Sequence, residues 1–312
     1  RNHFHCAFTH VQEAMDLGVV NRGALRVLSD DTARVYADFH ADWDAKLARA
    51  AMQLREWQPD VVLADVPYLT LAAAAQARIP SVALCSLNWA DIYAHYCGTH
   101  PEAPKILAQM RASYQSASVF LRPEPSMPMA DLTNTQAIGP LARVGQERRA
   151  ELREALGVNT GMRLVVIALG GIDTAVDISS WARNDAVRWL VQSDWNTHHP
   201  DALAWDPLGW NFIDVLRNAD AFITKPGYGS FAEGACNGVP VLYISRDDWP
   251  EQTCLTEWLP RHVPCAAIGA EQFARGEFMD ALNRLLSIPR PMPLEPSGIE
   301  QAADIIDPFL LG

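Results

Sequence analysis

The stretch Thr224-Lys-Pro-Gly-Tyr-Gly-Ser-Phe-Ala-Glu-Gly-Ala-Cys-Asn-Gly-Val-Pro240 is the most informative part of this 312-residue sequence. It joins an apolar run at 221–224 to another at 239–244. The residues between them fit a short helix, for which Ser230 is a candidate N-cap and Gly238 stands where a glycine commonly ends a helix. A short helix between two buried strands predicts a β-α-β unit.

The same alternation of apolar runs and helical segments occurs elsewhere in the chain. In the first half, apolar runs at 60–65 and 79–85 enclose the small-residue segment 69–77. The second half restarts the pattern with the run at 163–169. Nearly continuous apolar strands are typical of parallel sheets that helices cover on both faces. The predicted class is therefore α/β, with two doubly wound halves.

The boundary between the halves is predicted near residue 140. A Pro-rich stretch at 122–129 is expected to run over a surface. The segment 137–140, followed by a charged helix at 146–156, is typical of a crossing between domains. We predict an N-terminal domain at residues 1–139 and a C-terminal domain at residues 140–312, with the last helix packing back on the N-terminal domain.

Composition and charge restrict the class of ligand. The 25 Lys and Arg residues face 37 Asp and Glu residues, and the net charge of −12 disfavours DNA, RNA or an acidic membrane as the partner. A compact anion that binds in a local cationic pocket remains possible as the ligand. The six cysteines form no C-x-x-C pair, and no apolar run reaches the roughly 18 residues of a membrane span. We therefore expect a cytoplasmic protein with a small-molecule ligand.

The residues of the 224–240 block favour a phosphate site. Gly227 and Gly229 come after a strand and before a helix, where backbone N–H groups and the helix dipole can hold a phosphate. Lys225 adds a positive charge. Glu233 lies one turn along the helix, where a carboxylate can accept hydrogen bonds from a ribose diol. The alternative is a glycine-rich turn followed by a solvated glutamate, and the spacing alone does not decide between the two.

Other nucleotide and metal patterns are missing from the sequence. It contains no G-x-x-x-x-G-K-[ST] and no G-x-G-x-x-G, so Walker-type ATP chemistry and a dinucleotide fingerprint are not predicted. His198-His199 and the nearby aspartates make a cluster only by proximity. We predict no cofactor and no metal.

The run from Lys225 to Gln252 resembles the donor-binding signature of GT-B glycosyltransferases, in which basic and glycine residues hold the donor diphosphate. The resemblance gives Glu233 to the ribose and the Glu251-Gln252 pair to the sugar. The plant-type signature has a His at the position of Lys225. The run Arg246-Asp247-Asp248 follows a strand and is a further candidate for contact with the donor sugar. The predicted donor-binding residues are Gly170, Gly171, Lys225, Gly227, Tyr228, Gly229, Ser230, Glu233, Glu251 and Gln252.

A second resemblance covers most of the chain. The segments 65–68, 79–93, 169–171 and 225–233 resemble the glycosyltransferase-like region that precedes the sugar-kinase domain of plant arabinokinases, and its free-standing bacterial relatives. The resemblance implies a GT-B architecture, with two Rossmann-like domains facing each other across a cleft. It does not imply kinase activity, because no glycine-rich ATP loop follows the donor block. It also implies a first strand ending in a Gly- and His-rich loop, which we expect to be missing from this sequence.

Candidate catalytic groups come from strand ends in the first half, where ligands of open α/β sheets bind. Asp65 could take a proton from an acceptor hydroxyl if burial raised its pKa, and Asp91 follows the next strand. Asn88 and Trp89 are candidates for contact with a sugar. The structural alternatives are helix capping for the two aspartates and core packing for Trp89.

These observations lead to one predicted function and two alternatives. The leading prediction is a metal-independent glycosyltransferase of the hexosyl type, which moves a sugar from a UDP-type donor to an acceptor that the sequence does not identify. The alternatives are hydrolysis or epimerisation of a nucleotide sugar in the same pocket, and binding of a nucleotide sugar without catalysis. The sequence predicts no oligomeric state.

Overall fold

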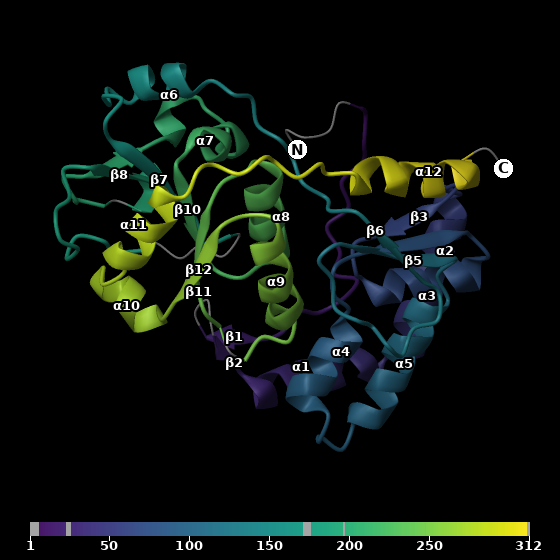
Figure 1. The fold of residues 1–312 in the computed structure, drawn as a ribbon. Helices are drawn as coiled ribbons and strands as arrows, with labels where there is room; N and C mark the ends of the chain where they lie inside the picture. The colour runs from purple at the N-terminus through teal and green to yellow at the C-terminus, as the bar shows by residue number, and fades with distance from the viewer. Residues whose placement is uncertain (1–5, 23–25, 171–175, 196, 247, 311–312) are drawn as a thin grey trace.

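The computed structural model describes residues 6–22, 26–170, 176–195, 197–246 and 248–310. These residues form two lobes, each built on a parallel sheet with helices packed against it (Figure 1). A short antiparallel pair, β1 (Asn21–Arg22) and β2 (Arg26–Val27), precedes the first lobe. The predicted α/β class with two parallel sheets is confirmed.

The N-terminal lobe has a four-stranded parallel sheet in the order β3-β4-β5-β6. Its largest buried side chains are aromatic, and Tyr68 and Tyr114 meet edge to face at 6.0 Å between ring centroids. The strands are β3 (Val62–Ala64), β4 (Ser81–Leu84), β5 (Val119–Pro123) and β6 (Thr135–Ile138). The helices are α1 (Ser29–Ala41), α2 (Trp43–Trp57), α3 (Tyr68–Ala77), α4 (Trp89–Cys97) and α5 (Ala103–Gln115).

The C-terminal lobe has a six-stranded parallel sheet in the order β12-β11-β10-β7-β8-β9. Its strands are β7 (Arg163–Ile167), β8 (Val187–Val191), β9 (Ala202–Ala204), β10 (Ala221–Thr224), β11 (Val241–Ile244) and β12 (Cys265–Ile268). Its helices are α6 (Arg149–Ala155), α7 (Phe212–Asn218), α8 (Tyr228–Cys236), α9 (Gln252–Trp258), α10 (Ala270–Arg275) and α11 (Met279–Ser287). Three 3-10 turns lie at Ser193–Trp195, Asp206–Leu208 and Leu259–Arg261.

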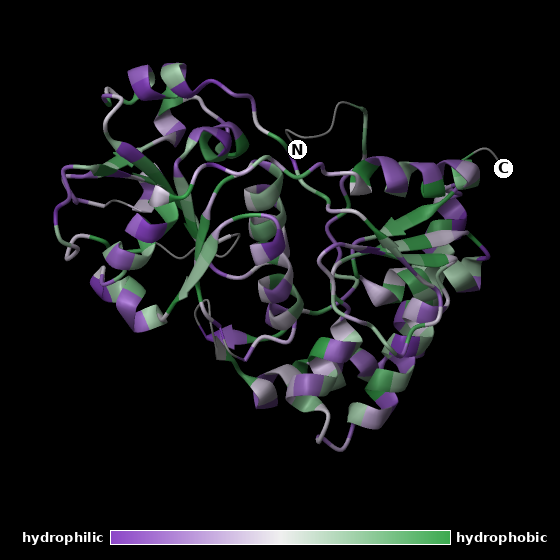
Figure 2. Ribbon diagram, in the orientation of Figure 1, coloured by the Kyte–Doolittle hydropathy of each residue, from purple (hydrophilic) through white to green (hydrophobic). Residues whose placement is uncertain are grey.

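Helices cover the C-terminal sheet on both faces. Successive residues of a strand point to opposite faces, and β7 accordingly contributes Leu164 and Val166 to one core cluster and Val165 and Ile167 to another. Helices α8 and α9 pack in the first cluster, whereas α10 and α11 pack in the second. Figure 2 shows the buried strands mainly in the hydrophobic colour. Figure 1 shows that α8 and α9 lie on the side facing the N-terminal lobe.

The last helix, α12 (Gly298–Leu310), packs on the N-terminal sheet rather than on the C-terminal one (Figure 1). Ala302 lies in a cluster with Val82 and Leu121 of that sheet. The segment leading into α12 crosses the segment that leaves β6, and the backbone N–H of Gly298 donates to the carbonyl of Pro140 at 3.2 Å. The chain therefore passes between the lobes twice at one place.

Two local predictions were wrong. The stretch at 122–129 was expected to run over a surface, but Pro123, Met127 and Met129 are buried because they pack into the N-terminal lobe. Helix α8 begins at Tyr228 with Gly227 as its N-cap, so Ser230 lies inside the first turn and is not the cap. Gly238 follows the C-cap of α8 with φ 63°, as predicted for a helix-ending glycine.

Candidate functional site

Three strand ends of the C-terminal sheet bring a glycine and two cations together. Strand β10 lies between β7 and β11, so the residues that follow these strands share one edge of the sheet. Lys225 directly follows β10, and Arg246 lies two residues beyond β11. Burial and the positive charge of Arg246 both lower the pKa of Lys225. A Cβ added to Gly170, after β7, would lie 3.5 Å from Cε of Lys225.

Helix α8 begins beside these cations with open space around its first residues. Its N-cap Gly227 has extended backbone angles, φ −159° and ψ 141°. A Cβ added to Gly229 would meet no heavy atom of the described residues within 4 Å. Neither glycine has a positive φ, so the described packing does not require glycine at either position. An unobstructed helix N-terminus next to Lys225 is the arrangement that an anion needs.

Glu233 lies on α8 and points toward the segment that enters the C-terminal lobe. Its Oε1 contacts Nη2 of Arg143 at 3.4 Å. Burial raises the pKa of this carboxyl, and Arg143 opposes that shift. One turn further, Asn237 receives the backbone N–H of Gly145 at 2.9 Å and is fully buried. Glu233 and Asn237 of α8 therefore hold the segment that enters the C-terminal lobe.

A cavity of about 220 Å³ joins this block to the N-terminal lobe. Tyr228 lines it from α8, and its hydroxyl accepts the backbone N–H of Leu141 at 2.7 Å. Asp65 lines it from the end of β3 and is exposed. Burial raises the pKa of the Cys85 thiol to about 12, so this cysteine is neutral at pH 7. The lining residues are Leu63, Asp65, Leu84, Cys85, Ser86, Pro123, Leu141 and Tyr228.

Glu251 and Gln252 hold parts of the protein together in this structure. Glu251 is only 4% exposed, and its two carboxylate oxygens accept hydrogen bonds from the Ser86 hydroxyl at 2.6 Å and the Trp249 indole at 3.2 Å. Burial raises the pKa of Glu251. Gln252 Oε1 accepts the backbone N–H of Arg246 at 2.6 Å. A contact of either side chain with a sugar therefore requires it to leave or share these partners.

Asn88, Asp91 and Trp89 have structural partners. Asn88 is buried and caps α4, because its Oδ1 accepts the backbone N–H of Asp91 at 2.8 Å and its Nδ2 donates to the Asp91 carboxylate at 2.8 Å. Burial raises the pKa of Asp91, and the hydrogen bond from Asn88 opposes this shift. The indole of Trp89 donates to the Asp16 carboxylate at 2.9 Å. Asn88, and not Asp91, is the cap of α4, and none of the three residues lines the 220 Å³ cavity.

Comparison with known proteins gives one distant curated relative. No protein-family model matches the chain. The L-arabinokinase of Arabidopsis thaliana is 24% identical over 311 residues, which are 96% of this chain and 29% of that protein. The chain therefore spans less than a third of this relative's length. The similarity is a distant homology that extends over nearly the whole chain.

Solved structures match the arrangement of both lobes. The calicheamicin glycosyltransferase CalG4 has a TM-score of 0.61 at 16% identity, over 94% of this chain and 82% of that one. The chain has the GT-B glycosyltransferase fold. A UDP-glucosyltransferase from Polygonum tinctorium gives 0.53 at 12% identity, over 84% and 74% of the two chains. The spinosyn rhamnosyltransferase SpnG gives 0.52 at 16% identity, over 91% and 77%.

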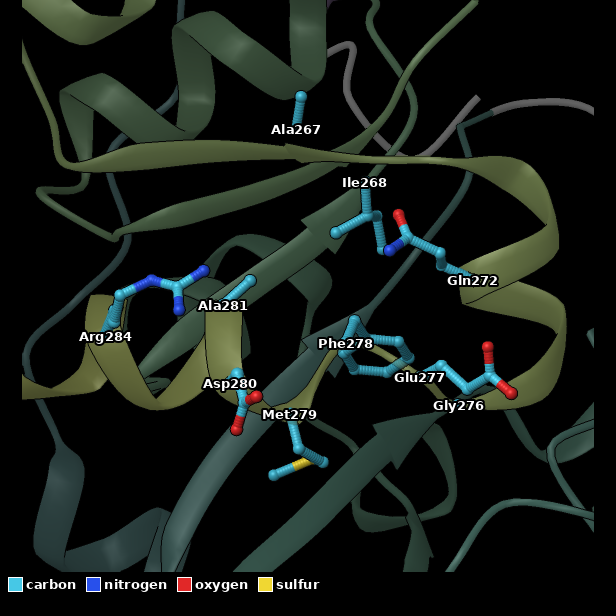
Figure 3. Close-up of a pocket in the computed structure, with 10 residues that line it drawn as sticks. All are labelled: Ala267, Ile268, Gln272, Gly276, Glu277, Phe278, Met279, Asp280, Ala281 and Arg284. Carbon is cyan, nitrogen blue, oxygen red and sulfur yellow. The ribbon is translucent and has the colours of Figure 1, made fainter.

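A larger cavity of about 530 Å³ lies elsewhere on this GT-B protein (Figure 3). It lies at β12, α10 and α11, and these two helices pack on the opposite face of the sheet from α8. None of its lining residues belongs to the predicted donor set, and the charged side chains around it carry both signs. The lining residues are Ala267, Ile268, Gln272, Gly276, Glu277, Phe278, Met279, Asp280, Ala281 and Arg284.

The described residues offer no site for a metal ion. Within the described ranges, no group of three or more His, Cys, Asp or Glu side chains is arranged to hold a metal ion. His199 is buried, and its ring nitrogens contact the Trp181 carbonyl and the Asp201 N–H. Gly171 and Asp247 lie outside the described residues. No described helix is long and apolar enough to cross a membrane.

Sequence reasoning missed Arg143 and assigned Arg246 only to the donor sugar. Arg143 lies in the segment between the lobes, and nothing in its local sequence indicates that it meets Glu233 across 90 positions. Arg246 has a weak signal, because it follows a strand that neighbours the strand before Lys225. Its burial beside Lys225 becomes visible only in the folded GT-B protein.

Proposed function

We propose that this protein is a glycosyltransferase that transfers a sugar from a nucleoside-diphosphate donor. The observation that carries the proposal is the open N-terminus of α8 beside Lys225, at the strand ends of a GT-B fold. The donor would occupy the C-terminal domain, residues 140–312. The acceptor would approach from the N-terminal domain, residues 1–139, whose Asp65 lines the cavity between the lobes.

The C-terminal lobe would stabilise the departing diphosphate. When the bond between the sugar carbon and the diphosphate oxygen breaks, negative charge grows on the diphosphate. Lys225, the backbone N–H groups of the first turn of α8 and the helix dipole supply positive potential where that charge develops. Gly170, Gly227, Gly229 and Ser230 would border the same group, and the Glu233 carboxylate would accept hydrogen bonds from the ribose hydroxyls.

Asp65 would act as the general base. It is the one carboxylate among the described residues that line the cavity between the lobes, and its exposure leaves it accessible to an acceptor. A carboxylate within hydrogen-bond reach of the acceptor hydroxyl can remove its proton as the oxygen attacks the sugar. Asp91 is a weaker candidate, because Asn88 holds its side chain at the start of α4.

The predicted donor contacts also suggest which nucleotide carries the sugar. UDP is the proposed carrier, because a glutamate at the position of Glu233 is the ribose ligand of the UDP-type signature that the sequence resembles. A hexosyl group is the proposed cargo. All six cysteines are free, which fits the reducing environment of the cytoplasm.

Isothermal calorimetry with UDP tests the donor site. Glu233→Ala should weaken UDP binding by about 1–3 kcal/mol, because a charged hydrogen-bond partner of the ribose is lost. Glu257→Ala, an exposed glutamate on α9, is the matched control and should leave UDP affinity unchanged. Equal UDP affinity of wild type and Glu233→Ala would contradict the site.

A thermal-shift panel of UDP-, GDP- and dTDP-sugars tests the donor class, because a ligand that binds the native state raises its apparent stability. The donor that raises Tm is then incubated with candidate acceptors, and the products are analysed. Free sugar released without an acceptor would show hydrolysis. Binding without any turnover would show that the protein only binds nucleotide sugars. Either result would contradict glycosyl transfer.

A further inference from the structure

The loop after β11 contains a buried cation with unused hydrogen-bond donors. The Arg246 side chain is 10% exposed, and its Nε and Nη2 have no hydrogen-bond partner among the described residues. Its ion-pair contact is long, with Nε 3.5 Å from a carboxylate oxygen of Asp248, a residue whose side chain is half exposed. Buried polar groups are normally hydrogen-bonded, and an unpaired buried charge is costly. Among the described residues, Arg246 thus lacks the hydrogen-bond partners that its burial calls for.

The neighbour of Arg246 makes the imbalance larger. Lys225 is half-buried at the end of the adjacent strand, and its burial, together with the positive charge of Arg246, lowers its pKa. The positive end of the α8 dipole begins three residues after Lys225. Three sources of positive potential therefore converge on a region where the ion-pair contact of Arg246 is the long one to Asp248.

The position of Arg246 is fixed by its neighbours. Gln252 holds its backbone N–H at 2.6 Å, and its guanidinium carbon lies 4.5 Å from the centre of the Trp249 ring. The Trp249 indole in turn donates to the buried Glu251. A stacked guanidinium loses little freedom when it forms further hydrogen bonds, so this arginine is prepared for a ligand before the ligand arrives.

We propose that Arg246 is a second diphosphate-binding residue, which acts with Lys225 and the N-terminus of α8. The inference rests on the proposed function, because it assigns a ligand group to the same site. A guanidinium presents its donors as a planar fork that fits phosphate oxygens in pairs. Two cations and a helix N-terminus match the charge of a diphosphate better than that of a monophosphate. The site therefore selects nucleoside diphosphates over monophosphates through Arg246.

Calorimetry with UDP and UMP on Arg246→Gln tests this selection. We expect about ten- to hundredfold weaker binding of UDP, because charged hydrogen bonds to the diphosphate are lost. Binding of UMP should change by much less, so the ratio of UDP to UMP affinity should fall. Arg246→Lys should recover part of the UDP affinity because it keeps the charge but not the fork. Arg284→Gln removes an exposed cation from the larger cavity of Figure 3 and should change neither affinity.

Thermal unfolding without ligand separates binding from a structural role. Removing a buried charge whose ion-pair contact is long should leave the Tm of Arg246→Gln equal to that of wild type or raise it. A lower Tm together with equal losses for UDP and UMP would show that Arg246 supports the fold, and would overturn the inference. Unchanged UDP affinity in a folded Arg246→Gln protein would also overturn it while leaving the proposed function intact. Failure of the wild type to bind any nucleoside diphosphate would instead contradict the proposed function.

Discussion

Polar residues at the strand ends of the two lobes differ in whether the protein itself satisfies them. In the C-terminal lobe, Arg246 has donors without a partner, and Gly229 borders open space, as far as the described residues go. In the N-terminal lobe, the side-chain amide of Asn88 caps α4, and the Ser86 hydroxyl donates to Glu251. Polar groups that the protein itself satisfies contribute to the fold, whereas groups left unsatisfied at a strand end are available for a ligand.

This contrast separates candidates that the sequence treats alike. Asp65 and Asp91 both follow strands of the first sheet, but Asp65 lines the cavity and Asp91 is held by Asn88. Gly229 and Gly234 both belong to α8, but only at Gly234 would a Cβ meet a side chain, Cγ2 of Val241 at 2.9 Å. Paired substitutions therefore test the contrast directly.

The largest effect is expected at Asp65. Asp65→Asn should slow transfer of the sugar from the UDP-sugar to the acceptor hydroxyl, measured as UDP released in the presence of the acceptor, by about 10²–10⁴-fold, because a general base contributes that much, while UDP affinity stays the same. Asp91→Asn is the matched control and should retain turnover close to wild type. A turnover lost in Asp91→Asn and kept in Asp65→Asn would reverse the two assignments.

Gly229 and Gly234 form the second pair. Gly229→Val should reduce UDP affinity by about ten- to hundredfold, since the side chain fills the space in front of the α8 N-terminus. The unfolding free energy should change by less than about 1 kcal/mol, which is the scale of helix propensity. Gly234→Val should instead destabilise the protein by about 1–3 kcal/mol through overpacking. Calorimetry and urea unfolding of both variants measure the two effects, and a Gly229→Val protein with full UDP affinity would break the contrast.

The buried bond between Ser86 and Glu251 gives a pH-dependent prediction. Burial raises the pKa of Glu251 above its ordinary value of 4.5, so the folded state binds this proton more tightly than the unfolded state does. The unfolding free energy should therefore fall as the pH rises from 4.5 through the raised pKa, and Glu251→Gln should remove this slope. Ser86→Ala should cost about 1–3 kcal/mol at pH 7, because a buried carboxylate loses a donor.

Urea unfolding across this pH range measures the slope. Thr256→Ala, which removes a hydroxyl that bonds only within α9 among the described contacts, is a control for Ser86→Ala. Identical slopes for wild type and Glu251→Gln would show that the carboxyl is not desolvated by the contact between the lobes.

The smallest effect is expected at Asn88. Asn88→Ala should lower the unfolding free energy by about 1 kcal/mol, because the N-cap hydrogen bond of α4 is lost. UDP affinity should remain unchanged. A large loss of UDP affinity, measured by calorimetry on the folded variant, would mean that the N-terminal strand end also contacts the donor.

Much of the fold could be predicted from the sequence, because buried parallel strands leave continuous apolar runs. The run at 221–224 coincides with β10, and the run at 60–65 contains β3. The block at 224–240 could be recognised as a candidate donor site because its glycines, its lysine and its helix follow one another directly in the sequence. Its role in binding a donor stays a prediction. The error at Met127 and Met129 arose because prolines between apolar residues do not show which face is covered.

The features of the candidate site that the sequence did not predict depend on contacts between residues far apart in the chain. Ser86 and Glu251 are 165 positions apart, and the sequence gives no reason for a hydroxyl to meet that carboxylate. Arg246 reads as an ordinary loop arginine until its burial and its unused donors are known. Asn88 could be assigned as the cap of α4 only when its side chain was seen to contact both the backbone N–H and the carboxylate of Asp91.

The crossing of the two interlobe segments has a mechanical consequence. A Cβ on Gly298 would collide with the Gly139 carbonyl, so only glycine lets the two backbones run this close. Because both covalent connections between the lobes pass through one point, that point can serve as a hinge about which the lobes rotate without stretching either connection. The buried Ser86–Glu251 hydrogen bond also joins the two lobes, so it would resist a rotation that separates these two residues.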